Sequence, residues 1–244
     1  MLLDKRDIGQ VLKKALSHGA EFAEVFWEQK ETSAIGCEDD RIERIVSGVD
    51  EGVGIRVIFG NSSSYAFTNE VSLERLLEVA ELAGKAARKQ VTSRVLPRFY
   101  TPAARAEFKV EIPPDKVKIE TKADKVLEAN KAARRVDSRV RQVSVSYADV
   151  KQRVVIANSE GVYVEDLRTR TRFSVNTVAA EGGVVQTGYK SAAGTTGFEL
   201  LKDNDPFELG EDAAKRAVLM LSAQPAPKGR MPVVMAGQAG GTMV

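Results

Sequence analysis

Apolar residues in the first part of the chain recur at the spacing of an amphipathic helix and then change to short runs typical of strands. The helical group consists of Ile8, Val11, Leu12, Ala15 and Leu16. Asp4 and Asp7 suit the N-terminus of this helix, and His18-Gly19 would end it. Strands are predicted over residues 22–28, 32–37, 41–46, 53–59 and 64–67. A second helix would begin after Ser72, which can cap it.

The rest of the chain repeats this alternation of helices and strands after a break. Residues 91–114 have little periodicity and are rich in proline, which is typical of an exposed linker. Beyond the break we expect a helix over about 115–136 and a last helix that begins at Asp205-Pro206. The strands expected between these two helices cover 142–147, 154–157 and 162–164.

This order of elements indicates an α+β fold of two domains, each mainly an antiparallel sheet covered by helices. We expect an N-terminal domain over 1–90, a linker over 91–114 and a middle domain over 115–230. Met231 to Met235 form an apolar run that predicts a buried strand, and the glycines after it are typical of a tight turn. A buried strand needs backbone partners on both sides, so we expect 231–244 to be the first strand and turn of a truncated C-terminal domain.

Composition narrows the class of protein. The chain has 244 residues, of which 43% are hydrophobic and 29% charged, and these values are ordinary for a globular protein. A net charge of +2 argues against nucleic acid as a partner, because nucleic-acid binders usually carry a strong basic excess. No apolar run is long enough to span a membrane, and the charged N-terminus does not suit a signal peptide. The single cysteine fits a reducing compartment, so we expect a cytoplasmic protein.

Several sequence blocks resemble the TldD/PmbA family of zinc peptidases. Residues 19–25 read Gly-Ala-Glu-Phe-Ala-Glu-Val, and residues 52–56 read Gly-Val-Gly-Ile-Arg. Residues 156–161, Ile-Ala-Asn-Ser-Glu-Gly, resemble the hairpin of the family's middle domain, and Pro232-Val233-Val234 resembles the approach to its metal helix. These blocks cover both proposed domains in the family's order, and the Gly-Gly-Thr-Met-Val ending is more similar to the TldD branch than to the PmbA branch.

The resemblance implies a zinc-dependent enzyme that cleaves unstructured peptides as a homodimer or as a heterodimer with a TldD/PmbA-type subunit. In the family a His-Glu-x-x-x-His helix and a later cysteine would bind the zinc, and the glutamate between the histidines would act as base. This chain ends just before that helix, in what would be the C-terminal metallopeptidase domain. We therefore assign no catalytic, cofactor-binding or metal-binding residue within the chain, and expect it to be inactive alone.

The residues that could still bind a metal have simpler explanations. His18 is the one histidine, and a surface or helix-end position explains it better than a ligand role. Cys37 lies in a predicted strand, where a half-buried thiol without an activating histidine is a structural residue. Glu38-Asp39-Asp40 could attract Mg²⁺ or Ca²⁺, but consecutive acids on a turn point in different directions and usually form a solvated loop.

Three further motifs have residue types that can bind ligands. Gly52-Val53-Gly54 lacks the strand-loop-helix setting of a dinucleotide site, so a close strand crossing or a bulge explains it better. Arg168, Arg170 and Arg172 share one face of a predicted strand and could meet phosphates, but a solvated face paired with acids such as Glu165 is the simpler interpretation. The glycine-rich stretch over 182–197 is interpreted as loop structure.

Two hypotheses of different classes remain open at this point. In the first, the chain is the N-terminal and middle region of a TldD-type zinc metallopeptidase. In the second, it is a complete, non-catalytic module that binds peptides or docks onto a catalytic subunit by strand addition.

Overall fold

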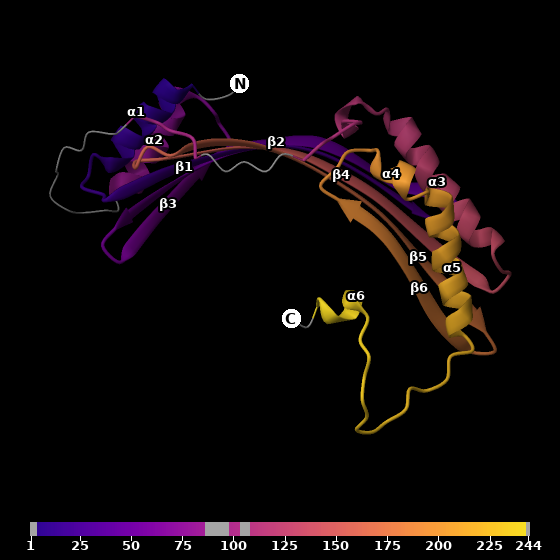
Figure 1. Cartoon of the computed structure of the whole chain (residues 1–244). Helices are drawn as coiled ribbons and strands as arrows, with labels where there is room; N and C mark the ends of the chain where they lie inside the picture. Colours follow the sequence, from indigo (N-terminus) through magenta and orange to yellow (C-terminus); the bar gives the residue numbers. More distant parts are fainter. Residues whose placement is uncertain (1–3, 86–97, 103–107, 243–244) are drawn as a thin grey trace.

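The described residues form one antiparallel sheet of six strands that curves into an arch (Figure 1). The computed structural model describes residues 4–85, 98–102 and 108–242. The strand order across the sheet is β3-β2-β1-β4-β5-β6. The strands are β1 (Phe22–Glu38), β2 (Arg41–Phe59), β3 (Ser62–Thr68), β4 (Val140–Asn158), β5 (Tyr163–Glu181) and β6 (Val184–Gly194). The α+β class is confirmed, but the strands of the two expected domains belong to a single sheet.

Helices lie on the convex side of this sheet, in two groups at its two ends (Figure 1). At one end are α1 (Lys5–Leu16) and α2 (Leu73–Lys85). At the other end are η1 (Pro114–Lys116), α3 (Ile119–Arg135), α4 (Leu200–Asp203) and α5 (Pro206–Met220). A short last turn, α6 (Gly237–Gly240), lies on the concave side. Within the described residues, no helix is both long enough and apolar enough to cross a membrane.

The helix boundaries follow the capping residues of the sequence. Asp4 accepts a hydrogen bond from the backbone N–H of Arg6 at the start of α1, and Asp205 accepts one from Phe207 at the start of α5. Ser72 accepts a hydrogen bond from the N–H of Arg75 in the first turn of α2. These three predicted helix starts are therefore confirmed. The helix expected from about residue 115 begins at Ile119 instead, after the separate turn η1.

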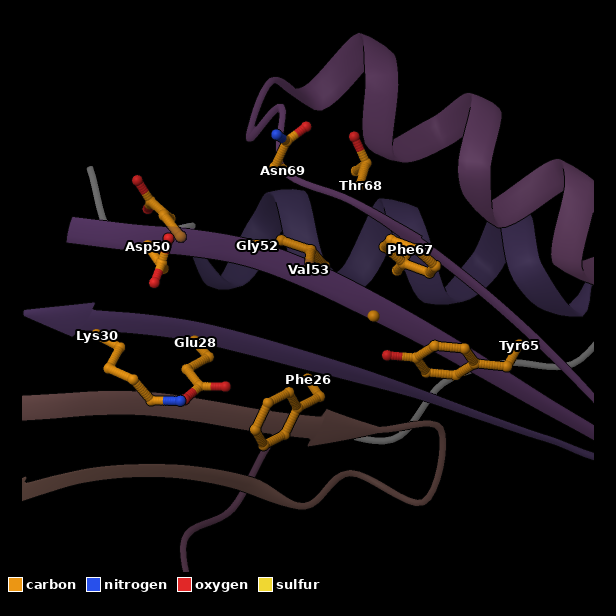
Figure 2. Close-up of a pocket in the computed structure, with 12 residues that line it drawn as sticks. Phe26, Glu28, Lys30, Asp50, Gly52, Val53, Tyr65, Phe67, Thr68 and Asn69 are labelled. Carbon is orange, nitrogen blue, oxygen red and sulfur yellow. The ribbon is translucent and has the colours of Figure 1, made fainter. Parts of the chain in front are cut away.

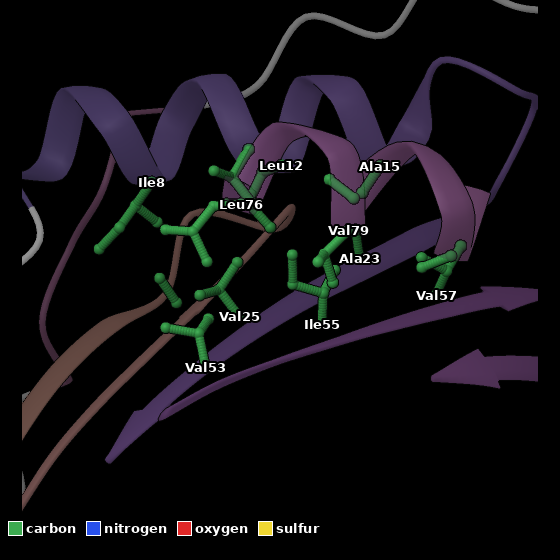
Figure 3. Packing of buried hydrophobic residues seen from close by; sticks show 14 of the residues in the cluster. Ile8, Leu12, Ala15, Ala23, Val25, Val53, Ile55, Val57, Leu76 and Val79 are labelled. Atoms are coloured by element: carbon green, nitrogen blue, oxygen red, sulfur yellow. The ribbon is translucent and has the colours of Figure 1, made fainter. Parts of the chain in front are cut away.

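The first core lies under α1 and α2 (Figure 3). It joins Ile8, Leu12 and Ala15 of α1 and Leu76 and Val79 of α2 to alternate residues of the strands. The strand residues drawn with them are Ala23, Val25, Val53, Ile55 and Val57. Because successive side chains of a strand point to opposite faces, only every second strand residue reaches this core.

The second core lies under α3 and α5 at the far end of the sheet. Val126, Ala129 and Ala133 of α3 pack with Tyr147 of β4 and Phe173 of β5. Small residues on the helices allow α3 and α5 to approach each other and the strands closely. Three strands, β1, β4 and β5, contribute buried residues to both cores, so the sheet joins the two cores.

Four short strands expected in the N-terminal domain form two long ones. The breaks expected at residues 29–31 and 47–52 lie within β1 and β2, which pair continuously from Phe22 opposite Ile58 to Gly36 opposite Arg44. These stretches lie between the two helix groups and are mostly polar, with Val49 exposed. The loss of alternation there predicts loops, whereas the strands continue and their side chains are exposed or only partly buried.

Two further predictions are wrong. Residues 184–194 form β6, not a loop, and Gly182-Gly183 make only the turn that precedes it. Gly188 lies in this strand because α5 crosses it closely, so that a methyl group there would lie 2.0 Å from the carbonyl oxygen of Ala213.

Met231 to Met235 do not form the predicted strand and are exposed, since no strand within the described residues offers them backbone partners. Of the predicted linker, residues 91–97 and 103–107 lie outside the described residues.

Candidate functional site

A hollow of about 260 Å³ lies where β1, β2 and β3 meet. Figure 2 shows the aromatic side chains of Phe26, Tyr65 and Phe67 on one side of it, with Glu28, Lys30 and Asp50 on the other. The strand register produces this arrangement, because it places Phe26 opposite Gly54, Gly54 opposite Phe67, and Lys30 opposite Asp50. The aromatic and the charged side chains therefore share the face of the sheet that is opposite the first core.

The aromatic side of the hollow depends on Gly54. A methyl group at this position would lie 2.1 Å from the hydroxyl oxygen of Tyr65, so only glycine lets the tyrosine ring lie across β2. The rings of Tyr65 and Phe67 are stacked with their centroids 6.3 Å apart, and these residues are 62% and 75% exposed. Gly52-Val53-Gly54 is thus part of a continuous strand. The close contact at Gly54 comes from the Tyr65 side chain, and β2 has no bulge there.

The charged side of the hollow is held by hydrogen bonds. The Glu28 carboxylate lies 3.0 Å from the Lys30 ammonium and accepts a hydrogen bond of 2.8 Å from the Gln152 side chain. Partial burial acts to raise the pKa of Glu28, but the bonds from Lys30 and Gln152 outweigh burial and hold the pKa below its ordinary value. Glu28 therefore stays ionised at neutral pH.

The side chains of this hollow can contact a polypeptide, but they include no group that could hydrolyse a peptide bond. Its side chains offer exposed aromatic faces, carboxylates and one ammonium group, which suit an extended polypeptide with mixed side chains. The residues that line it include no histidine, cysteine or paired nucleophile and base.

A second chemical group is buried on the helix side of the sheet. The Lys122 ammonium of α3 donates to the Asp149 carboxylate at 2.5 Å and to the Ser33 hydroxyl at 2.8 Å. The Ser33 hydroxyl donates to the same Asp149 oxygen at 2.6 Å. The ammonium also lies 5.4 Å from the ring centre of Tyr147, whose pKa is raised by burial and by the neighbouring Asp149 charge. This group fastens α3 to β1 and β4 beside a groove of about 470 Å³.

Sequence reasoning missed this buried pair, although two signals pointed to it. Lys122 occupies the same helical stripe as Ile119 and Val126, so its position predicts a buried side chain. Asp149 continues the alternation of the inward-facing Val145 and Tyr147 along β4. A cation and an anion that each fall on an apolar face are expected to pair, because an isolated buried charge is costly.

His18 and Cys37 do not fit a zinc site. His18 follows α1 and packs near Gly84 of α2, whereas Cys37 is buried in the second core. About 15 strand residues separate them, which is roughly 50 Å of sheet. Burial raises the pKa of the Cys37 thiol, with the nearby Asp40 charge adding to the shift, so the thiol stays protonated. Among the described residues, no three His, Cys, Asp or Glu side chains are arranged to hold one metal ion.

The carboxylates of Glu38, Asp39 and Asp40 contact protein side chains and are not arranged around a common metal position. Asp39 and Asp40 form the turn between β1 and β2 with positive φ angles. Both form ion pairs with Arg134 of α3, with a distance of 3.2 Å to Asp40, and Glu38 accepts a hydrogen bond from Gln142. These acids fix the hairpin to α3, so their charge is already neutralised in part.

The arginine ridge lies on one face of β5, as predicted. Arg168 pairs with Asp166 at 2.5 Å, so the predicted partner Glu165 was wrong; Glu165 accepts from the Tyr163 hydroxyl at 2.6 Å instead. Arg172 donates to the hydroxyl of Tyr189 on β6. The side chains on the opposite face, such as Thr171 and Phe173, are buried. This pattern is that of a solvated sheet face.

Family models identify the chain. The model of the PmbA/TldA metallopeptidase domain 1 matches residues 23–87, and the model of the central domain of the same family matches residues 112–221. The chain belongs to the PmbA/TldD metallopeptidase family. In this PmbA/TldD chain the first match covers β1 to α2, and the second covers α3 to α5 with the strands between them.

Relatives support this membership. A metalloprotease of Methanothermobacter thermautotrophicus is 32% identical over 236 residues, which are 96% of this chain and 50% of the relative. A TldD homologue of Haemophilus influenzae is 27% identical over 90% of this chain and 47% of its own length. The structure of TldE from Thermococcus kodakarensis shares the fold with a TM-score of 0.68 and 16% identity, over 87% of this chain and 47% of that one. The chain thus spans about half the length of the curated relatives it matches.

Proposed function

We propose that this chain is the N-terminal and middle region of a TldD-type zinc metallopeptidase that cleaves unstructured peptides. One observation supports this most strongly: two consecutive domain models of one metallopeptidase family match the chain in order over the whole curved sheet. The alternative, a complete, non-catalytic module that binds peptides or docks onto a catalytic subunit, is less well supported because the relatives are named metalloproteases.

The role of this region would be to bind the peptide rather than the zinc. The hollow beside Gly54 presents aromatic rings and ionised groups on an open face of the sheet. An extended peptide can reach these groups while the protein stays folded. A folded substrate would expose few of the side chains that such a surface can contact. The zinc ligands and the catalytic base of the enzyme would come from residues outside this sequence, because His18 and Cys37 lie far apart. We further propose that the enzyme is a dimer, as the resemblance to the family implies, and that it is cytoplasmic, in line with the free thiol of Cys37.

Zinc content and peptide cleavage test this proposal. The full-length product of the gene should hold about one zinc per subunit by elemental mass spectrometry and should cleave an unfolded substrate such as reduced, carboxymethylated lactalbumin. A chelator should abolish that cleavage. The 244-residue chain, folded by circular dichroism, should hold no stoichiometric zinc and show no cleavage. Stoichiometric zinc together with chelator-sensitive proteolysis in the 244-residue chain would refute the proposal.

Variants of the hollow test its part in substrate binding. Replacing Tyr65 and Phe67 by alanine in the full-length enzyme should raise KM several-fold and leave kcat nearly unchanged, because only binding contacts are removed. Leu82→Ala is the matched control, since Leu82 is an exposed apolar residue on α2. An unchanged KM in the double variant would show that the hollow does not contact the substrate.

A further inference from the structure

The floor of the hollow is bare backbone beside an unpaired carboxylate. Gly52 and Gly54 follow Asp50 at alternate positions of β2, on the face opposite the first core, and Gly48 precedes it on the same face. These three glycines leave no side chain of β2 next to the Asp50 carboxylate on that face. Asp50 is exposed, and within the described residues it forms no ion pair or hydrogen bond. Its carboxylate is therefore free to pair with a ligand.

The charges that line the hollow do not cancel. Lys30 lies opposite Asp50 in the strand register, but its ammonium group pairs with the Glu28 carboxylate at 3.0 Å. Glu51 also lines the hollow and accepts a hydrogen bond of 2.9 Å from the indole N–H of Trp27, a donor without charge. Among the residues that line the hollow, three carboxylates thus face one ammonium group. The excess of negative charge favours a cation as the bound group.

An aromatic wall stands at the other end of the same stretch of β2 (Figure 2). The register places Phe67 opposite Gly54, and the Tyr65 ring lies across Gly54. Four residues separate Gly54 from Asp50, which is about 13 Å along the strand. A lysine or arginine side chain reaches about 6–7 Å from its Cα atom. Its aliphatic stem can therefore pack against the rings while its charged end lies near the carboxylate.

We propose that the hollow is a specificity pocket for a basic side chain of the peptide substrate, with Asp50 as its counter-ion. The inference rests on the function proposed above, in which the hollow contacts the peptide. Aromatic ring faces attract cations, and the planar guanidinium of arginine can stack on a ring and also donate two hydrogen bonds to a carboxylate. An acidic side chain would be repelled. A neutral apolar side chain would take water from Asp50 without replacing its hydrogen bonds.

Peptide binding to the 244-residue chain, measured by NMR titration, tests the inference without any need for cleavage. The probes are short peptides of alternating glycine and serine with one central arginine, citrulline or glutamate; citrulline has the shape of arginine but no charge. The amides of Gly52 and Gly54 and the indole N–H of Trp27, the single tryptophan, report on the hollow. We expect the arginine peptide to shift these signals and to bind about fivefold or more tightly than the citrulline peptide. The glutamate peptide should bind most weakly.

Two variants separate the role of the charge from that of the rings. Asp50→Asn keeps the shape of the side chain and should bring the arginine and citrulline peptides within about twofold of each other. Tyr65→Ala removes a ring face and should weaken the binding of both peptides. Asp124→Asn, the same change at an exposed position of α3, is the matched control and should keep the wild-type preference. Signals outside the hollow that match wild type would show that each variant is folded.

The other outcomes argue against the proposed pocket. Equal affinities of the wild-type chain for the arginine and citrulline peptides overturn it, as does a preference that Asp50→Asn leaves intact. Shifts confined to residues outside the hollow would place the binding elsewhere and overturn it too, and so would the absence of binding at several millimolar peptide. These measurements record binding, whereas the proposed function is tested by zinc content and proteolysis of the full-length enzyme, so either proposal can fail alone.

Discussion

The Glu199 carboxylate should make a large, pH-dependent contribution to stability. Glu199 precedes α4, is 8% exposed and accepts four hydrogen bonds. Three come from the backbone N–H groups of Glu111, Ile112 and Gly197, at 3.1, 2.8 and 2.8 Å. The fourth comes from the Thr196 hydroxyl at 2.6 Å. These bonds join residues 111–112 to the segment that follows β6.

The pKa of Glu199 gives the size of this effect. Burial acts to raise the pKa, but the hydrogen bonds from Thr196, Gly197 and Ile112 lower it from 4.5 to about 2. A shift of this size corresponds to about 3 kcal/mol in favour of the charged form in the folded state. Because the folded-state pKa is the lower one, this stability is present above pH 4.5 and is lost as the pH falls toward 2.

We expect Glu199→Gln to lower the free energy of unfolding by roughly 2–3 kcal/mol at pH 7, since glutamine keeps one acceptor but loses the charge. The difference between variant and wild type should shrink as the pH falls from 4.5 to 2, and urea unfolding across this range measures it. Glu160→Gln, in the exposed β4–β5 turn, should change stability by less than about 0.5 kcal/mol. A loss for Glu199→Gln that is under about 1 kcal/mol, or that stays constant with pH, would refute the reasoning.

Three other changes test the packing. Lys122→Ala should cost about 3–5 kcal/mol in urea unfolding because it leaves Asp149 buried and unpaired, and adding Asp149→Leu should recover most of that loss. Gly188→Ala should cost about 1–3 kcal/mol because the methyl group meets the backbone of α5, whereas Gly9→Ala in α1, where nothing lies within 4 Å, should be neutral or stabilising. The Cys37 thiol should react with a disulfide reagent at pH 8 only as fast as the chain unfolds, and fast labelling of the native chain would contradict its burial.

Features that depend on local sequence were predictable. The starts of α1 and α5 follow from Asp4 and from Asp205-Pro206, because a cap satisfies backbone groups within its own first turn. The hairpin at 158–161 follows from its turn residues for the same reason.

Features that depend on contacts between residues far apart in the sequence could not be predicted from the pattern of apolar and polar residues. The joining of both halves in one sheet rests on β1 pairing with β4 along almost its full length, and no local signal reports that pairing. The hollow depends on the register of β2 and β3, which brings Tyr65 over Gly54. The exact pairing of these two strands decides which of their side chains meet. Residues 184–194 read as loop because the close approach of α5 requires a glycine in the strand.

The sheet between its two cores has a mechanical consequence. Around residues 28–32 of β1 the strands lie between the two helix groups, with the short turn η1 beside them, where Asp115 pairs with Lys151 of β4 at 3.1 Å (Figure 1). A change of about 2° in twist per residue over about five residues would rotate one end by about 10°, and over a lever of about 25 Å this displaces it by roughly 4 Å. A change in twist of this size lies within the range that paired strands adopt, so the ladder can spread it over several residues. The distance between the two helix groups is therefore expected to respond to small changes in strand twist.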